Sequence, residues 1–160
     1  MTVAEFQTSP NRIPWPPLIY IAAFAISIVL GVFVPLPWFS GPLSDILFAM
    51  GWLAIAAVVA IDVSAMRTLS RAKTTIMPHR GSDHLVTSGP FSFTRNPIYL
   101  ANTLAMFGAG MITGIVWFFV FGLVAAFATQ KLAIEREEQH LAARFGKKYL
   151  DYKKRVRRWI

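Results

Sequence analysis

The chain has 160 residues and a formal net charge of +8; 55% of its residues are hydrophobic and only 15% are charged. Its apolar residues stand in long blocks, which excludes an ordinary soluble domain and indicates a membrane protein. There is no cysteine, so disulfides, thiolate metal sites and a cysteine nucleophile are excluded.

The first apolar block predicts a membrane-spanning helix. No residue from 13 to 44 is charged, and the run LIYIAAFAISIVLGVFV, residues 18–34, is about long enough to cross a hydrocarbon core roughly 30 Å thick. The preceding MTVAEFQTSPNRIPWPP holds an acidic residue and several prolines where a signal peptide has a basic segment. We therefore expect no cleaved signal there.

Further apolar blocks predict three more spans. Residues 46–66 form the second, interrupted only by Asp62 near its end. The region 98–132 is too long for one ordinary span, and GAGMITG, residues 108–114, supplies a break, which gives spans at about 98–111 and 114–132. We expect a single all-α integral membrane domain over residues 1–160, with about four transmembrane helices and a C-terminal helix at the cytoplasmic interface.

The positive charges predict the orientation. All 16 Lys and Arg residues lie at Arg12, between Arg67 and Arg95, or from Lys131 onward. With four spans these three regions share one face, so the positive-inside rule places both termini and the middle loop in the cytoplasm.

The C-terminal segment predicts an amphipathic helix. Its apolar residues recur every three or four positions: Leu141, Phe145, Tyr149, Tyr152, Val156 and Trp159. The positions between them hold Lys147, Lys148, Lys153, Lys154, Arg155, Arg157 and Arg158. Because this segment follows a membrane span, we expect anionic lipid headgroups as its partner, not nucleic acid.

Other motifs give little. The GAGMITG run has one residue too many for a dinucleotide-binding glycine loop, and Gly110 and Gly114 have helix-packing spacing although a turn explains them better. The histidines at positions 79, 84 and 140 form no metal-ligand pattern, so we expect no metal site.

Two polar clusters lie at predicted cytoplasmic helix ends. In HLVTSGPFSFTRNPIYLAN, residues 84–102, Pro97 suits a first helical turn, Asn96 is a candidate cap, and Arg95 beside the free N–H groups makes an anion-holding corner. In EREE, residues 135–138, the glutamates make a cation-holding corner. Together the two corners could hold a mixed-charge molecule at the membrane surface.

Each residue alone also has an ordinary interpretation. Arg95 could be a topology anchor, Glu137 and Glu138 could balance nearby cations, and His84 could be a loop histidine. The order and spacing of the whole set favour a site.

That order resembles the isoprenylcysteine carboxyl methyltransferase family and its bacterial and phospholipid-methylating relatives, over roughly the C-terminal half of the chain. The resemblance rests on a His-x-Leu-x-Thr-x-Gly-Pro segment, an Arg-Asn-Pro-x-Tyr segment, a Glu-Glu pair, Phe-Gly, two spaced tyrosines and a Val-x-Arg ending. These are His84, Leu85, Thr87, Gly89 and Pro90; Arg95, Asn96, Pro97 and Tyr99; Glu137 and Glu138; Phe145, Gly146, Tyr149, Tyr152, Val156 and Arg158.

The resemblance implies a membrane enzyme that transfers a methyl group from S-adenosylmethionine to a lipophilic acceptor. It implies that segments 78–99 and 133–160 cover the cofactor on the cytoplasmic side. It also suggests Arg95 and Glu138 as catalytic residues, although the choice between the adjacent glutamates stays open. The residues expected to line the cofactor are His84, Leu85, Val86, Gly89, Pro90, Asn96, Tyr99 and Glu137.

One departure affects the acceptor. Eukaryotic members of that family carry His after the Arg, where this chain has Asn96. The Asn form resembles the bacterial branch and favours a bacterial inner membrane, and it leaves prenylcysteine, phospholipid amines, small thiols and other lipophilic acids or amines open. A nicotinamide-dependent membrane reductase of related fold and a noncatalytic adaptor with a basic tail are the rival functions. The oligomeric state stays open.

Overall fold

The computed structural model describes residues 15–72 and 85–160, and within them the chain is all-helical, as the sequence predicts. His84 and the first part of the predicted cofactor-covering segment, residues 78–84, lie outside the described residues.

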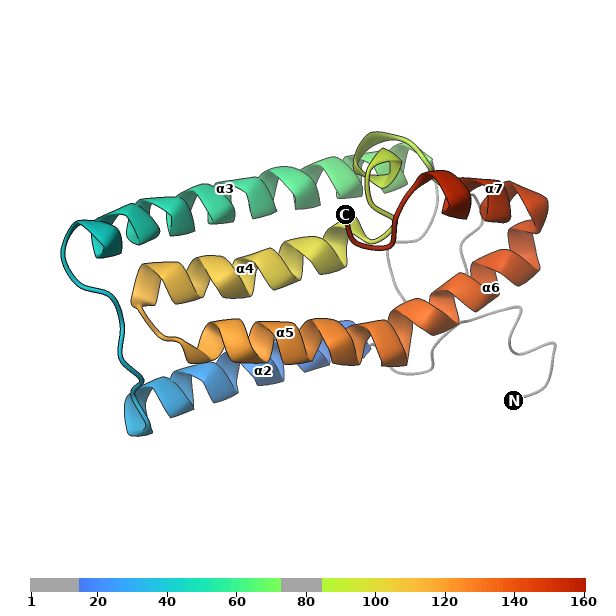
Figure 1. The fold of residues 1–160 in the computed structure, drawn as a ribbon. Coiled ribbons are helices and arrows are strands. Elements are labelled where there is room, and N and C mark those ends of the chain that lie inside the picture. The colour runs from blue at the N-terminus through green and yellow to red at the C-terminus, as the bar shows by residue number, and fades with distance from the viewer. Residues whose placement is uncertain (1–14, 73–84) are drawn as a thin grey trace.

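Four long helices run side by side. They are α2 (Trp15–Phe33), α3 (Pro42–Arg71), α4 (Pro97–Thr113) and α5 (Trp117–Thr129). Helix α4 lies between α3 and α5, and α2 lies along α5 (Figure 1). A π-helical turn, η2 (Gln130–Ile134), carries α5 directly into α6 (Glu135–Phe145), and α7 (Lys147–Arg155) folds back from α6. A short 3-10 turn, η1 (Gly89–Ser92), precedes α4.

The outer surface of the bundle is apolar, as a membrane requires. Within residues 15–72 and 85–160, three helices are long and apolar enough to cross a bilayer: Trp15–Phe33, Pro42–Arg71 and Trp117–Phe145. Large side chains point away from the protein, with Leu53 70% exposed and Phe33 78% exposed. Such a surface would be costly in water and is covered by lipid in a membrane.

Helix α4 is shorter than the other spans. Its 17 residues correspond to about 25 Å at 1.5 Å per residue, less than a hydrocarbon core roughly 30 Å thick. The four-span count therefore stays a prediction.

The long helix Trp117–Phe145 changes character along its length. Its 29 residues correspond to about 43 Å, more than a hydrocarbon core requires. The apolar part ends before Lys131, and α6 begins with the charged sequence EREE. Helix α6 therefore extends beyond the hydrocarbon.

Glycines allow close packing in the bundle, as Gly51 and Gly114 show. A Cβ at Gly51 of α3 would lie 2.9 Å from the carbonyl oxygen of Gly108 in α4, so the two backbones approach directly. Gly114 ends α4 at φ 72°, and Trp38 covers it so closely that a Cβ there would lie 2.9 Å from the indole. The break in the last apolar region therefore falls between Thr113 and Trp117, so only Gly114 of the predicted stretch 108–114 belongs to it and residues 108–113 continue α4.

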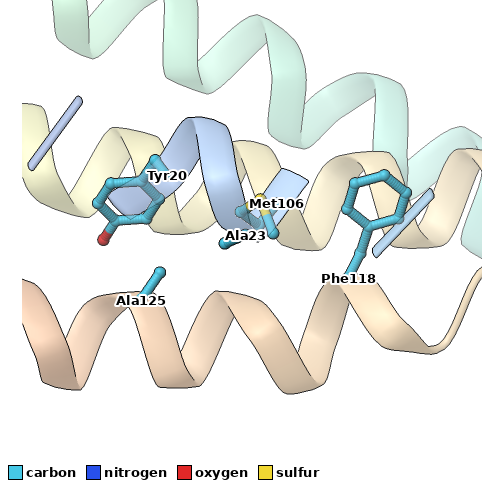
Figure 2. Close-up of a cluster of buried hydrophobic side chains, with 5 residues drawn as sticks. All are labelled: Tyr20, Ala23, Met106, Phe118 and Ala125. Carbon is cyan, nitrogen blue, oxygen red and sulfur yellow. The ribbon is translucent and has the colours of Figure 1, made fainter. Parts of the chain in front are cut away.

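The bundle core lies between α2, α4 and α5. It contains Tyr20 and Ala23 from α2, Met106 from α4, and Phe118 and Ala125 from α5, all shown in Figure 2. This core ties α2 to the helices that lead into the polar end of the molecule.

The C-terminal segment is amphipathic but is not one helix. Tyr149, Tyr152 and Val156 are buried as a cluster with Leu85 and Phe145 among their neighbours, as the spacing predicts. The prediction of one continuous helix was wrong. Gly146, at φ 52°, separates α6 from α7, and the chain becomes extended at Val156 with φ −117° and ψ 128°.

Candidate active site

Charged groups gather at one end of the bundle. Within the described ranges every Lys and Arg lies at the C-terminal end of α3, before α4, or from Lys131 onward, and these parts lie at the same end of the molecule (Figure 1). The loops at the other end, residues 34–41 and 114–116, carry no charge. The candidate site is therefore at the charged end, where α6, α7 and the segment before α4 meet.

A buried carboxylate stands at the centre of this end. Glu138 Oε1 lies 3.1 Å from Nη1 of Arg95, and the side chains of both residues are 9% exposed. Arg158 donates from Nε to Oε1 at 2.8 Å and from another nitrogen, Nη2, to Oε2 at 2.9 Å. Lys153 Nζ lies 3.5 Å from Oε2. We call Arg95, Glu138, Lys153 and Arg158 the ion cluster; in it three cations share one carboxylate.

The backbone of the C-terminal tail, residues 156–160, holds the segment around Arg95. The N–H of Arg95 donates to the carbonyl of Arg157 at 3.0 Å. The carbonyl of Arg158 accepts from Thr94 Oγ1 at 3.2 Å and from Asn96 Nδ2 at 2.9 Å. The tail thus joins three consecutive residues before α4.

Aromatic hydroxyls fix the rest of this segment. Tyr149 accepts a hydrogen bond from Arg95 Nη1 at 3.1 Å, and Tyr152 donates to the carbonyl of Phe91 at 2.6 Å. Trp159 donates from its indole to Gln130 in the π-helical turn at 2.9 Å. Helix α7 and the tail are therefore hydrogen-bonded both to the segment before α4 and to the π-helical turn η2.

The neighbouring glutamate has a different environment. Glu137 is half-buried and accepts a hydrogen bond from the Tyr99 hydroxyl at 2.7 Å. The Tyr99 carbonyl accepts from Tyr20 at 3.3 Å, and the Tyr20 hydroxyl shares a 2.6 Å hydrogen bond with Thr103. Glu137 is therefore positioned by a polar path that continues into the core shown in Figure 2.

The two glutamates differ in their electrostatics. Burial raises the pKa of Glu137 to about 7; the neighbouring charge of Glu138 adds to the rise and the hydrogen bond from Tyr99 opposes it. Burial also acts to raise the pKa of Glu138, but the hydrogen bonds of Arg158 and the charges of Arg95, Arg158 and Lys153 lower it overall. Within residues 15–72 and 85–160, Glu137 has no ion pair with a Lys or Arg.

Arg95 keeps an unused donor. Its Nε is buried and has no hydrogen-bond partner among the described residues, although Nη1 contacts both Glu138 and Tyr149. An unpaired buried donor is costly, so this atom is available to a ligand that accepts a hydrogen bond.

The other predicted site residues spread along the segment before α4. Leu85 packs on the cluster of Tyr149, Tyr152 and Val156. Val86 is half-buried and Pro90 is buried. Gly89 has φ 59°, and a Cβ there would lie 2.6 Å from Thr68 Oγ1, so it packs against α3.

Asn96 occupies the position before α4 but does not cap it. Its side chain makes no capping hydrogen bond and donates instead to the carbonyl of Arg158, so the prediction of a side-chain cap was wrong. Pro97 does stand at the start of α4, as the sequence predicts. The Arg158 carbonyl in the tail binds the Asn96 side chain in place of the helix N-terminus. The two residues are 62 positions apart in sequence, so local sequence rules do not reveal this contact.

Sequence reasoning did not assign three members of the site. It placed Tyr149 and Arg158 in the family pattern and in the amphipathic tail, and Lys153 only among the cations of that tail, without a role for any of them. Their positions at fixed spacing after the glutamates were the available signal.

The donor set fits S-adenosylmethionine, which carries a sulfonium, an ammonium and a carboxylate. Glu137 is a half-buried carboxylate whose raised pKa falls when a cation binds beside it. The first turn of α4, after Asn96, offers free N–H groups suited to a carboxylate. No group of three or more His, Cys, Asp or Glu able to hold a metal ion occurs in the described ranges.

These features define an α-helical membrane protein with a charged site built on the end of its bundle. Residues 46–148 match the phospholipid methyltransferase family, well over half of the chain, and the chain belongs to this family, which includes the isoprenylcysteine carboxyl methyltransferase-like proteins. Its members are methyltransferases. The resemblance read from the sequence is confirmed.

A curated relative covers a smaller part. The nickel-cobalt-cadmium resistance protein NccN of Alcaligenes xylosoxydans xylosoxydans is 37% identical over 77 residues, which are 48% of this chain and 36% of that protein. The matched stretch thus spans about a third of the relative's length.

Proposed function

We propose that this chain transfers a methyl group from S-adenosylmethionine to a lipophilic, membrane-dissolved acceptor at the cytoplasmic face of a bacterial inner membrane. The observation that carries the proposal is the contrast between the adjacent glutamates. Glu138 is neutralised by cations of the protein, whereas Glu137 is a half-buried carboxylate with a raised pKa and no such cation among the described residues. A cationic ligand beside Glu137 supplies the missing charge.

The cofactor role falls on Glu137 and the segment before α4. Glu137 binds the cationic part of S-adenosylmethionine, and Tyr99 holds the carboxylate in place through its hydroxyl. The other residues proposed to line the cofactor are His84, Leu85, Val86, Gly89, Pro90 and Asn96. When bound, S-adenosylmethionine supplies a methyl group whose in-line transfer to a nucleophile breaks the carbon–sulfur bond and leaves its electron pair on sulfur.

The acceptor role falls on Arg95. Three cations of the ion cluster share one carboxylate, so an excess of positive charge remains to attract an anionic part of the acceptor. The buried Nε of Arg95 is an unused donor for such a group. Arg95 thus orients the acceptor, and Glu138 holds Arg95.

The electrostatics of Glu138 narrow the acceptor class. Its lowered pKa makes it a weak proton acceptor. An amine or thiol must lose a proton during methylation, whereas a carboxylate is already nucleophilic. Because we assign Glu137 to the cation of the cofactor, neither glutamate is free to act as a base, and we propose a lipophilic carboxylate as the acceptor class.

The exposed cations of α7 and the tail serve a separate purpose. Lys147, Lys148, Lys154, Arg155 and Arg157 are exposed, opposite the buried Tyr149 and Tyr152. This basic face is complementary to anionic lipid headgroups, which would keep the site at the membrane surface.

Binding of radiolabelled S-adenosylmethionine to the detergent-purified protein tests the proposal, with NADPH as competitor. We expect saturable binding that unlabelled S-adenosylmethionine displaces and NADPH does not. Displacement by NADPH would indicate a reductase instead, and no binding of either would indicate a noncatalytic protein. Methyl transfer is then assayed with farnesylated cysteine, phosphatidylethanolamine vesicles and dodecanethiol as acceptors, and the carboxylate probe should be preferred.

A further inference from the structure

The side chain of Arg158 forms the closest ion pairs of the ion cluster. It contacts both oxygens of Glu138, at 2.8 and 2.9 Å, through two different nitrogens. This paired geometry requires the planar guanidinium fork and fixes the plane of the carboxylate. The same Oε1 lies 3.1 Å from Arg95 Nη1. The orientation of Arg95 therefore depends on where Arg158 holds Glu138.

The backbone of the tail acts on the same target. The Arg158 carbonyl accepts hydrogen bonds from Thr94 and Asn96, the residues on either side of Arg95. The Arg95 N–H is held by the preceding carbonyl, that of Arg157. The tail therefore constrains Arg95 in two ways: its backbone binds residues 94–96 directly, and the Arg158 side chain acts through Glu138.

Burial makes these contacts strong. The side chains of Arg95 and Glu138 are each 9% exposed, so solvent screens their interaction little. Lys153 is 47% exposed on its side chain and lies farther from Glu138, at 3.5 Å, so it cannot replace the pair that Arg158 makes.

We infer that Arg158 is a positioning residue that orients the Arg95 guanidinium for the acceptor by fixing Glu138. Arg158 lies beyond the residues 46–148 that match the family. The inference rests on the proposed function for the identity of the reaction, but the effect of Arg158 on Arg95 is argued from the contacts of these residues in this chain and can be measured without turnover.

The test compares Arg158→Lys and Arg158→Ala with a matched control, Arg136→Ala. Arg136 is also an arginine at this end of the molecule, on α6, and it is exposed. Lys keeps the charge but lacks the planar fork that donates from two nitrogens to the two carboxylate oxygens, and Ala removes both charge and fork. We expect turnover at saturating S-adenosylmethionine to fall about tenfold for Arg158→Lys and about a hundredfold for Arg158→Ala, with cofactor affinity nearly unchanged. Arg136→Ala should resemble the wild type.

A second readout needs no acceptor. Phenylglyoxal modifies accessible arginine side chains, and peptide mass spectrometry resolves each site. Arg95 should react slowly in the wild type and in Arg136→Ala, and faster in both Arg158 variants. Added guanidinium ion should restore part of the turnover of Arg158→Ala, which a folding defect would prevent.

The outcomes separate the two proposals. Equal turnover in Arg158→Ala and Arg136→Ala, or unchanged protection of Arg95 in both Arg158 variants, overturns the positioning role. If Arg158→Ala does not fold, the same comparison of turnover and of Arg95 protection is made with Arg158→Lys, whose melting temperature should equal that of the wild type. Wild-type protein that binds no S-adenosylmethionine overturns the proposed function, while the labelling of Arg95 still tests the inference.

Discussion

Arg95 and Glu138 lie 3.1 Å apart although 42 residues separate them in sequence, and neither side chain is more than 9% exposed. The sequence suggested an anion-holding corner at Arg95 and a cation-holding corner at the glutamates. The structure joins Arg95 to Glu138 and leaves Glu137 hydrogen-bonded to the Tyr99 hydroxyl. The two predicted corners are therefore connected through the ion pair of Arg95 and Glu138. Substitutions of Glu137 and of Glu138 should have different effects.

Glu137→Gln should weaken S-adenosylmethionine binding by about tenfold or more. Gln keeps the size and can still accept the hydrogen bond from Tyr99, so the change removes only the charge that faces the cofactor's cation. Isothermal titration calorimetry of the purified protein measures the affinity for S-adenosylmethionine. Asp151→Asn is the control, because Asp151 is an exposed carboxylate on α7. Equal affinities of the two variants would mean that Glu137 does not contact the cofactor.

The raised pKa of Glu137 predicts two effects of pH. Glu137 binds its proton more tightly in the folded protein, at a pKa of about 7, than at the ordinary value of 4.5. This group therefore contributes stability that is fully present below pH 4.5 and is lost as pH rises to about 7. The melting temperature of the ligand-free protein should decline over this window, and Glu137→Gln should flatten the decline.

Cofactor binding should depend on pH in the opposite sense. Below pH 7 a proton must leave Glu137 before a cation can pair with it, so affinity for S-adenosylmethionine should fall about tenfold for each pH unit below that value. Titrations at pH 6 and pH 8 measure this difference. The same difference in Glu137→Gln would assign the effect to another group.

The fold was largely predictable, because membrane-spanning helices can be recognised from long apolar segments and from the charges that flank them. The apolar blocks, the break near Gly114 and the burial of Tyr149 and Tyr152 depend on residues close together in the chain. What could not be predicted is contact across long separations. The Asn96 side chain is a good cap by local rules, yet the carbonyl of Arg158 takes it.

The same limit applied to the glutamates. Two adjacent carboxylates on a helix point in directions about 100° apart, and the sequence cannot say which direction meets the protein's cations. That depended on the π-helical turn before α6 and on the fold of the tail, and neither has a clear sequence signal.

Gly51→Ala should destabilise the contact between α3 and α4. The new Cβ would lie 2.7 Å from a side-chain carbon of Ile112 and 2.9 Å from the Gly108 carbonyl oxygen, and a backbone oxygen inside a helix cannot move aside easily. We expect a loss of about 1–3 kcal/mol, seen as a lower melting temperature in detergent. Ala49→Leu adds a larger side chain at an exposed position of the same helix and should leave the melting temperature nearly unchanged.

The charge distribution predicts the topology. A reporter fused after Ile160 and one inserted near Ser82 should both report cytoplasm, and one near Ser40 should report the opposite side. Ser40 lies in the uncharged loop between α2 and α3, at the end of the bundle away from the ion cluster. Reporters after Ile160 and near Ser40 on the same side would contradict the four-span arrangement.

Arg95→Lys separates a role in catalysis from membrane anchoring. An anchor needs only a positive charge near the headgroups, which Lys provides. Arg95 instead contacts Glu138 and Tyr149 through Nη1 while its Nε stays unpaired among the described residues, and a single ammonium group cannot reproduce that arrangement. Insertion, folding and cofactor binding should stay nearly intact, because Arg158 and Lys153 still neutralise Glu138.

The loss in Arg95→Lys should appear in turnover. Misplacing an acceptor by about an ångström can cost on the order of a hundredfold in rate, and Arg95→Ala should lose more than Arg95→Lys. Single-turnover methylation of farnesylated cysteine at saturating S-adenosylmethionine measures the rate, with phosphatidylethanolamine vesicles as the second acceptor. A lysine variant that transfers methyl groups at the wild-type rate to both acceptors would leave Arg95 as a topology signal, because a residue that orients the acceptor cannot lose its planar fork without cost.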